Sequence, residues 1–270
     1  MKTTGIISFL AIALLSFAGC EKTETLEPDS IYKEKTVVFS SLKSDSLFQG
    51  VTFTRTLPLN TEFDIKKAEL KDVTAYLKIN GVSIIPIIYT ADGIYKPRDL
   101  MMIHSGDVYE LFAKYGEKSI YARTRIPVKP SVFSATLVNS KYIEARIAPR
   151  ENEAYAAAWF ITGANQYSYS GLATDFFEVY KTPENPPASV SIRTMDIPED
   201  YRTDNLAGKT YLKVISFDNG FYDYFRTRGN NQQVHNSFTQ GGSQVIWNVY
   251  GTDVIGMFIG SASGELVKPK

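Results

Sequence analysis

The sequence has a single cysteine, Cys20, and only two histidines, His104 and His235. A chain without a second cysteine forms no internal disulfide, so its stability has to come from burial of apolar groups. One cysteine and two distant histidines do not supply the ligands of a Cys/His zinc site, which leaves the two histidines combined with carboxylates as the only alternative. We therefore expect no metal and no cofactor.

An excess of charge of either sign is also missing. The 29 basic residues balance the 29 acidic residues, and no basic cluster stands out. This balance excludes strong electrostatic attraction to nucleic acid, so we expect no nucleic-acid partner.

Motifs of nucleotide binding and nucleophilic catalysis are absent as well. No phosphate-binding glycine pattern appears. The segment 260–264 has Ala262 where a Gly-x-Ser-x-Gly motif needs serine, and we predict a flexible terminal loop there. We expect no catalytic residue and no enzyme, although sequence alone does not exclude a spatial pair of carboxylates.

Long hydrophobic runs are limited to the first residues. Lys2 precedes the apolar stretch Ile6–Phe17, and Ala18-Gly19-Cys20 follows. About 20 apolar residues are needed to span a bilayer, so this shorter stretch predicts a cleaved signal peptide over residues 1–19. The small-small-Cys ending resembles a bacterial lipobox, with Phe17 where leucine is usual. The resemblance implies lipidation of Cys20 and a membrane anchor, whereas the alternative is an ordinary secretory signal.

Residues 20–35 are polar and lack periodicity, which predicts a lipidated tether. The acidic residues Glu21, Glu24 and Glu27 loosely resemble the surface-export signals of Bacteroidota lipoproteins. A solvated linker explains them equally well, so both the periplasmic face and the cell surface remain open.

Residues 36–126 are dense in β-branched and aromatic residues. The clearest hairpin joins Val73–Ile79 to Val82–Tyr89 through Asn80-Gly81, the preferred pair of a type I′ turn. Pro86 in its second arm indicates an edge strand or a bulge. A second hairpin joins Asp107–Ala113 to Ser119–Thr124. This spacing predicts an Ig-like β-sandwich.

Pro127 and Pro130 block regular structure and predict a linker over residues 127–130. We expect residues 131–270 to form a second β-rich domain with at most short helices. Its clearest strand is Tyr142–Ile147. Ala154–Ile161 fits a strand or a helix, and the flanking Pro149 and Gly163 favour the strand. Further predicted elements are the loop Thr182–Pro187, the strand Tyr211–Phe217, a short helix over Phe221–Arg228, and closing strands over Gln244–Val249 and Val254–Ile259.

Three local patterns together resemble a known family. They are Gly106-Asp107-Val108-Tyr109, Trp247-Asn248-Val249-Tyr250-Gly251 and Gly256-Met257-Phe258. With the lipobox, they are similar to a family of Bacteroidota lipoproteins of unknown function, whose members end in Asn-x-x-Gly followed by Gly-x-Phe. Such genes often lie beside those of TonB-dependent receptors. The resemblance implies an outer-membrane location, a TonB-dependent receptor as partner, and no established catalytic residue.

Aromatic residues are plentiful, with 17 tyrosines and 16 phenylalanines. Exposed tyrosine and tryptophan clusters favour binding of glycans, peptides or a protein partner, whereas β-domains also use such residues simply to build strands. The predicted function is a membrane-anchored, non-catalytic binding or accessory lipoprotein; the alternative is a structural or adhesive envelope protein without a small-molecule ligand. The candidate binding residues are Tyr167, Tyr169, Tyr180, Tyr222, Tyr224 and Trp247.

Overall fold

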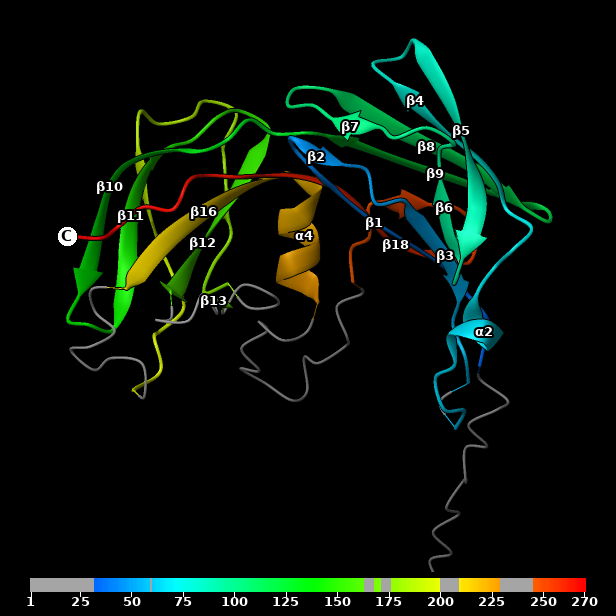
Figure 1. Cartoon of the computed structure of the whole chain (residues 1–270), viewed down its shortest axis with the longest axis horizontal. Coiled ribbons are helices and arrows are strands. Elements are labelled where there is room, and N and C mark those ends of the chain that lie inside the picture. Colours follow the sequence, from blue (N-terminus) through cyan, green and yellow to red (C-terminus); the bar gives the residue numbers. More distant parts are fainter. Residues whose placement is uncertain (1–31, 59, 163–167, 171–175, 200–208, 229–244) are drawn as a thin grey trace, which may run out of the picture. The chain divides into compact units, whose positions relative to one another are not determined.

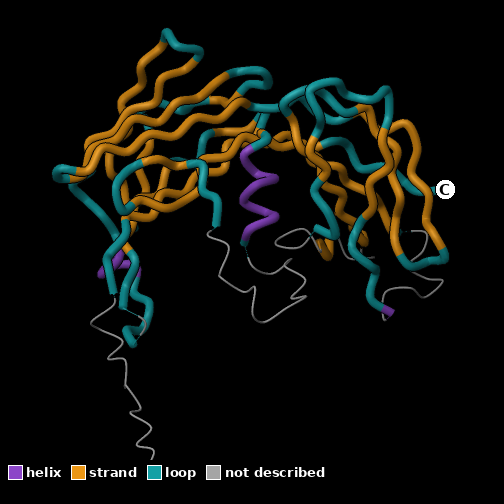
Figure 2. Tube along the Cα trace, turned by 180° about the vertical axis from the view of Figure 1, so that it is seen from behind, coloured by secondary structure: helices purple, strands orange, loops and turns teal. Residues whose placement is uncertain are grey.

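A computed structural model describes residues 32–58, 60–162, 168–170, 176–199, 209–228 and 245–270. Strands dominate this part of the chain (Figures 1 and 2). The prediction of an all-β fold with short helices is therefore confirmed. In the described residues the two helices are α2 (Ile65–Ala68) and α4 (Gly220–Thr227).

The strands follow one another along the whole described chain. They are β1 (Thr36–Lys43), β2 (Ser46–Leu47), β3 (Val51–Arg55), β4 (Thr74–Ile79), β5 (Ser83–Ala91), β6 (Ile94–Lys96), β7 (Met102–Ile103), β8 (Val108–Tyr115), β9 (Lys118–Arg125), β10 (Ser131–Val138), β11 (Tyr142–Ala148), β12 (Glu153–Thr162), β13 (Ser168–Ser170), β14 (Tyr180–Lys181), β15 (Val190–Arg193), β16 (Thr210–Asp218), β17 (Val249–Tyr250) and β18 (Val254–Ser263).

Two facing layers enclose the first hydrophobic core. One layer runs β18-β1-β3-β6, and the other runs β5-β4-β8-β9-β17. The layers are continuous through β5, which pairs with β4 in its first half and with β6 in its second half. Val38 and Phe53 from the first layer meet Leu77 and Leu111 from the second, all fully buried. Burial of each such side chain stabilises the fold by about 1.5–3 kcal/mol.

Both predicted hairpins of the first region are present as β4–β5 and β8–β9. Asn80 and Gly81 have φ values of 52° and 71°, and the Val82 N–H donates to the Ile79 carbonyl at 3.0 Å. This is the geometry of the predicted type I′ turn. Pro86 pairs with Tyr76 of β4, while β6 joins β5 only from Ile88 onward. At Pro86, β5 therefore pairs with β4 on one side only, as predicted for an edge strand.

In the second half, β12 pairs with β16, and the predicted strand over 154–161 is confirmed. Both faces of β12 are buried. Tyr155 and Trp159 pack against the three-stranded sheet β10-β11-β15, whereas Ala156 and Ala158 face α4 and its surrounding aromatic rings. Burial on two sides explains why this strand shows an apolar run instead of alternation.

The proline segment 126–130 contains no strand, as predicted. Its backbone is nevertheless held by the second half. The Val128 N–H donates to Glu153 Oε1 at 3.1 Å, and Ser216 Oγ donates to the Val128 carbonyl at 2.7 Å. Tyr155 donates to the other oxygen of Glu153 at 2.5 Å, and burial raises the pKa of this phenol, which keeps its proton in place. The division into domains 36–126 and 131–270 stays a prediction. The hydrogen bonds of Val128 attach the segment between them to the second half.

The C-terminal strand β18 lies between the two halves. It pairs in parallel with β1 over its first eight residues and in antiparallel with β16 near its end. Phe258 thereby enters the first core, fully buried. Beyond β18, the Val267 and Lys270 backbones pair with Leu212 and Ala135 and connect the edges of the two sheets of the second half.

Two sequence-based expectations near the C-terminus were wrong. Residues 260–264 are not a flexible loop, because β18 extends to Ser263 and Ser261 and Ala262 are buried. A side chain at Gly260 would overlap the Arg125 carbonyl, so small residues are needed where β9 approaches β18. The expected strand Gln244–Val249 is also absent over most of its described length. Residues 245–248 form no strand, and β17 begins only at Val249; Gln244 lies outside the described residues.

Gly256→Ala tests the β1–β18 pairing. Gly256 has φ 144°, and an added methyl group would overlap the Val38 carbonyl of the neighbouring strand. We expect the free energy of unfolding, measured with urea, to fall by about 3 kcal/mol or more. The control Gly81→Ala also has positive φ but meets nothing within 4 Å, so we expect a loss of about 1–2 kcal/mol. Equal losses in both variants would contradict the assigned close contact.

Candidate functional site

Helix α4 is anchored to the end of β16. Asp218 Oδ1 accepts the Gly220 N–H at 3.1 Å, and Thr227 Oγ donates to the Asp223 carbonyl at 2.7 Å in the last turn. One side of the helix carries Phe221, whose ring stacks on Phe217 with centroids 4.0 Å apart. The predicted helix over 221–228 is thus confirmed, and aromatic packing holds it against the sheet.

The segment 245–248 fixes Trp247 beside this helix. The Ile246 N–H donates to Thr227 Oγ at 2.9 Å. The Asn248 amide makes two hydrogen bonds to the main chain of Phe258, donating to its carbonyl at 2.6 Å and accepting its N–H at 2.8 Å. Between these anchors, the Trp247 ring lies 5.5 Å from the Tyr224 ring, centroid to centroid. The asparagine, Gly256 and Phe258 of the Asn-x-x-Gly and Gly-x-Phe patterns thus all have structural roles.

The outward faces of β1, β18 and β16 form the floor opposite these aromatic residues. Strand alternation turns Val38 and Leu42 into the core and leaves Phe39 and Lys43 outside. The register places Phe39 opposite Met257, and Lys43 opposite Ser261. Phe39 is 56% exposed and belongs to the lining of the concave surface described next.

A cavity of about 500 Å³ lies between this floor and helix α4. Its volume falls in the range of small-molecule sites, which are mostly apolar with few polar groups. Within the described part of the chain, the lining contains aromatic and aliphatic side chains, three serines and three cations, and no carboxylate, histidine or cysteine. The lining residues are Val37, Val38, Phe39, Ser41, Lys43, Phe176, Lys213, Ile215, Phe217, Phe221, Tyr224, Arg228, Trp247, Gly256, Met257, Ile259, Ser261 and Ser263.

Two of the six predicted binding residues, Tyr224 and Trp247, line the cavity together. Tyr222 is half-buried on α4 and lies outside the lining, with the Lys181 ammonium 5.4 Å from its ring centre. Tyr180 on β14 packs against the core between β12 and the three-stranded sheet. Tyr169 belongs to β13, where only the main chain is described, and Tyr167 and Cys20 lie outside the described residues.

Sequence reasoning did not find the floor of the cavity. Phe39 and Lys43 lie on β1, whereas Lys213 lies on β16, 170 residues after Lys43. The pairing of β18 with both strands places them in one sheet. The available signal was the alternation Phe39-x-Ser41-x-Lys43, which marks one face of a strand. Nothing local identifies that face as the side of a cavity.

A second aromatic set crosses the outer face of the first region. Tyr76, Phe112, Tyr121 and Tyr250 come from four neighbouring strands, with successive ring centroids 5.1, 5.1 and 6.3 Å apart. They follow the strand register, so each ring is the cross-strand neighbour of the next. Such pairs stabilise sheets, which is the alternative interpretation of the aromatic surplus.

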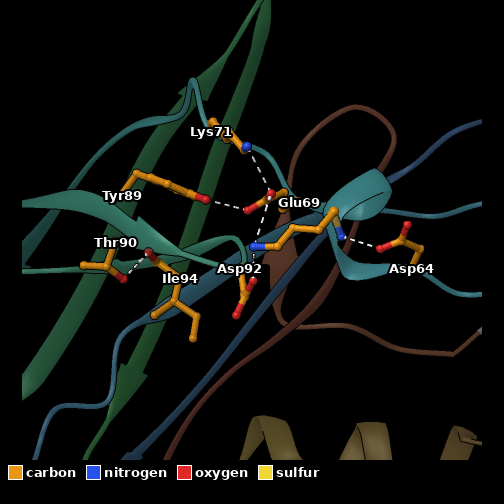
Figure 3. Close-up of polar contacts among 8 residues, drawn as sticks. Asp64, Glu69, Lys71, Tyr89, Thr90, Asp92 and Ile94 are labelled. Carbon is orange, nitrogen blue, oxygen red and sulfur yellow. Dashed lines mark hydrogen bonds and ion pairs between the residues drawn. The ribbon is translucent and has the colours of Figure 1, made fainter.

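One carboxylate with a perturbed pKa lies away from the cavity, between α2 and β5 (Figure 3). The Glu69 side chain is only 1% exposed and accepts the Tyr89 hydroxyl at 2.5 Å. Lys71 lies 3.1 Å from it and Lys66 3.9 Å, while Lys66 also pairs with Asp92 at 2.6 Å. The Tyr89 hydrogen bond, followed by the lysines, holds the pKa of Glu69 below its ordinary value. These contacts attach the segment after α2 to the sheet.

No protein-family model matches the chain, and a search of curated proteins finds no relative. Within the described ranges, no three His, Cys, Asp or Glu side chains gather in a metal-binding arrangement. Neither helix in that part of the chain has the length and apolar character needed to cross a membrane.

Glu69→Gln tests the buried carboxylate. Because the folded-state pKa of Glu69 is lowered, its charge contributes stability above the unfolded-state pKa of about 4.3, and this contribution is lost as pH falls through the folded-state value. We expect the variant to be less stable at pH 7, with the gap to wild type narrowing toward pH 3 in urea unfolding. The control Glu184→Gln replaces an exposed carboxylate and should be about as stable as wild type at pH 7. A pH-independent gap for Glu69→Gln would contradict the assignment.

Proposed function

We propose that the protein is a lipid-anchored, non-catalytic binding lipoprotein of the bacterial outer envelope, and that its cavity holds a ligand with an apolar or aromatic body. The observation that carries the proposal is the cavity between α4 and the β1–β18–β16 face, with Trp247 and Tyr224 on one side and Phe39 on the other. Rigid aromatic side chains supply large contact area at low cost in conformational entropy.

The fixed position of the aromatic walls supports binding over a purely structural or adhesive role. A structural envelope protein is expected to have a polar surface without a concave site. Here Asn248 and Thr227 hold the segment that carries Trp247 at both ends by hydrogen bonds. A preformed concave site binds with less loss of entropy than one that has to be ordered by the ligand.

The composition of the lining supports a non-catalytic role. An enzyme site is expected to bring together an acid, a base or a nucleophile. Three serines line the cavity, and among the lining residues that the structure describes there is no histidine, carboxylate or cysteine.

The lipid anchor and the protein partner are proposed on the basis of the sequence. Cys20 is the proposed lipidation site, and the resemblance to Bacteroidota lipoproteins supports an outer-membrane location on the periplasmic face or the cell surface. It also supports accessory work beside a TonB-dependent receptor. A glycan or a peptide that presents an apolar group is the corresponding ligand class.

Cys20→Ala tests the anchor. Without the thiol no acyl chain is attached, so the proposed contact with the lipid is lost. We expect the variant to move from the membrane pellet to the soluble fraction in cell fractionation followed by immunoblotting. The control Phe17→Leu restores the usual lipobox residue and should stay with the membrane. Retention of Cys20→Ala in the pellet would refute the anchoring proposal.

Trp247→Ala tests the cavity. The neutral bicyclic alcohol 2-naphthylmethanol should bind the full chain, solubilised in detergent, in isothermal titration calorimetry with a detergent-only blank. Removing the indole wall should weaken binding about tenfold or more, because a central aromatic contact is lost. The exposed Phe133→Ala, outside the cavity, should bind like wild type. Equal binding by wild type and Trp247→Ala would count against the cavity as the site.

A further inference from the structure

Strand β5 and the loop 97–101, which follows β6, together present an exposed apolar patch. Ile84 and Ile88 stand on the outward face of β5 and are 62% and 46% exposed, and Leu100 in the loop is 87% exposed. The loop lies beside the strand, because both line one groove of about 530 Å³. Exposed apolar side chains gathered in this way mark sites of protein association.

The free edge of β5 disfavours an added strand as the occupant. β6 joins β5 only from Ile88 onward, so at Pro86 the edge has no neighbouring strand. Proline in a sheet is placed with its nitrogen toward the unpaired side. A peptide strand laid along this edge would find no N–H group at Pro86, so contacts at the patch are made by side chains.

The loop also carries two adjacent residues of opposite charge, Arg98 and Asp99. Both are exposed, and both line the groove. In the part of the chain that the structure describes, neither side chain takes part in an ion pair or a hydrogen bond. A surface with one unpaired cation next to one unpaired anion is electrostatically complementary to a second copy of itself.

We infer that this patch, with Arg98 and Asp99 on its loop, binds a second copy of the chain about a twofold axis. A twofold contact is reciprocal, because each copy presents the same surface to the other. Two loops that meet in opposite directions place Arg98 of each copy opposite Asp99 of the other. Leu100 of each copy then faces the groove beside β5 of the other copy.

The two charges favour a second copy over a different protein. A different protein would need an apolar surface that also carries an anion and a cation in the matching order. A second copy supplies all of these, and the like-charge contacts that exclude wrong partners are absent from the reciprocal arrangement. The inference goes beyond the proposed function, because neither β5 nor the loop 97–101 contributes to the lining of the cavity at α4.

Charge reversal tests the inference. The full chain, solubilised in detergent, is followed by sedimentation velocity at a solvent density that matches the detergent, and we expect a dimer that dissociates on dilution. Arg98→Glu and Asp99→Lys each place like charges opposite each other, so each should raise the dissociation constant about tenfold or more. The double variant R98E/D99K restores opposite charges across the axis and should dimerise like wild type. The control Lys67→Glu, on α2, should also dimerise like wild type.

The other outcomes overturn the inference. A wild-type chain that stays monomeric shows that no second copy binds, and a dimer unchanged by either single reversal lies on another surface. Loss of the dimer in both single variants without recovery in R98E/D99K contradicts a reciprocal contact. The cavity is tested separately, because R98E/D99K should bind 2-naphthylmethanol like wild type and Trp247→Ala should keep the dimer.

Discussion

The parallel pairing of β1 with β18 is the contact on which the rest of the structure depends. It joins strands more than 200 residues apart and places Phe258 in the core beside Val38. The same pairing, through the other faces of these strands, brings Phe39, Met257, Lys43 and Ser261 to the floor of the cavity. Core and cavity are therefore two sides of one strand pair, and a change that loosens the pairing affects both.

Local signals predicted the local elements well. Turn chemistry at Asn80-Gly81 and strand alternation identified both hairpins of the first region, because such a turn and its two strands are neighbours in sequence. The apolar stretch 154–161 was predicted as a strand from its length and flanking residues, and burial of both its faces gives the reason for its missing alternation. Tyr224 and Trp247 were found by residue type alone.

Long-range contacts account for what was missed. Gly260 to Gly264 has the composition of a loop, yet β18 continues to Ser263, and Gly260 has no room for a side chain because the Arg125 carbonyl of β9 lies against it. Residues 245–248 have the composition of a strand, yet they serve as an anchored segment that presents Trp247. Phe39 and the two lysines became part of a site only through pairing across the chain. In each case the deciding neighbour is distant in sequence, so the local pattern does not contain the information.

The cavity also has to be explained against the tendency of proteins to fill such space. Interiors pack to a density of about 0.75, and substitutions that fill cavities commonly stabilise proteins. The Ala156 and Ala158 face of β12 shows that this chain fills space well beside α4, where Phe176 and Phe225 occupy the room left by small residues. On the neighbouring floor the chain instead keeps Phe39 exposed and places two lysines without carboxylate partners among the described residues. Apolar surface left unfilled in this way fits the proposed binding of a ligand with an apolar body.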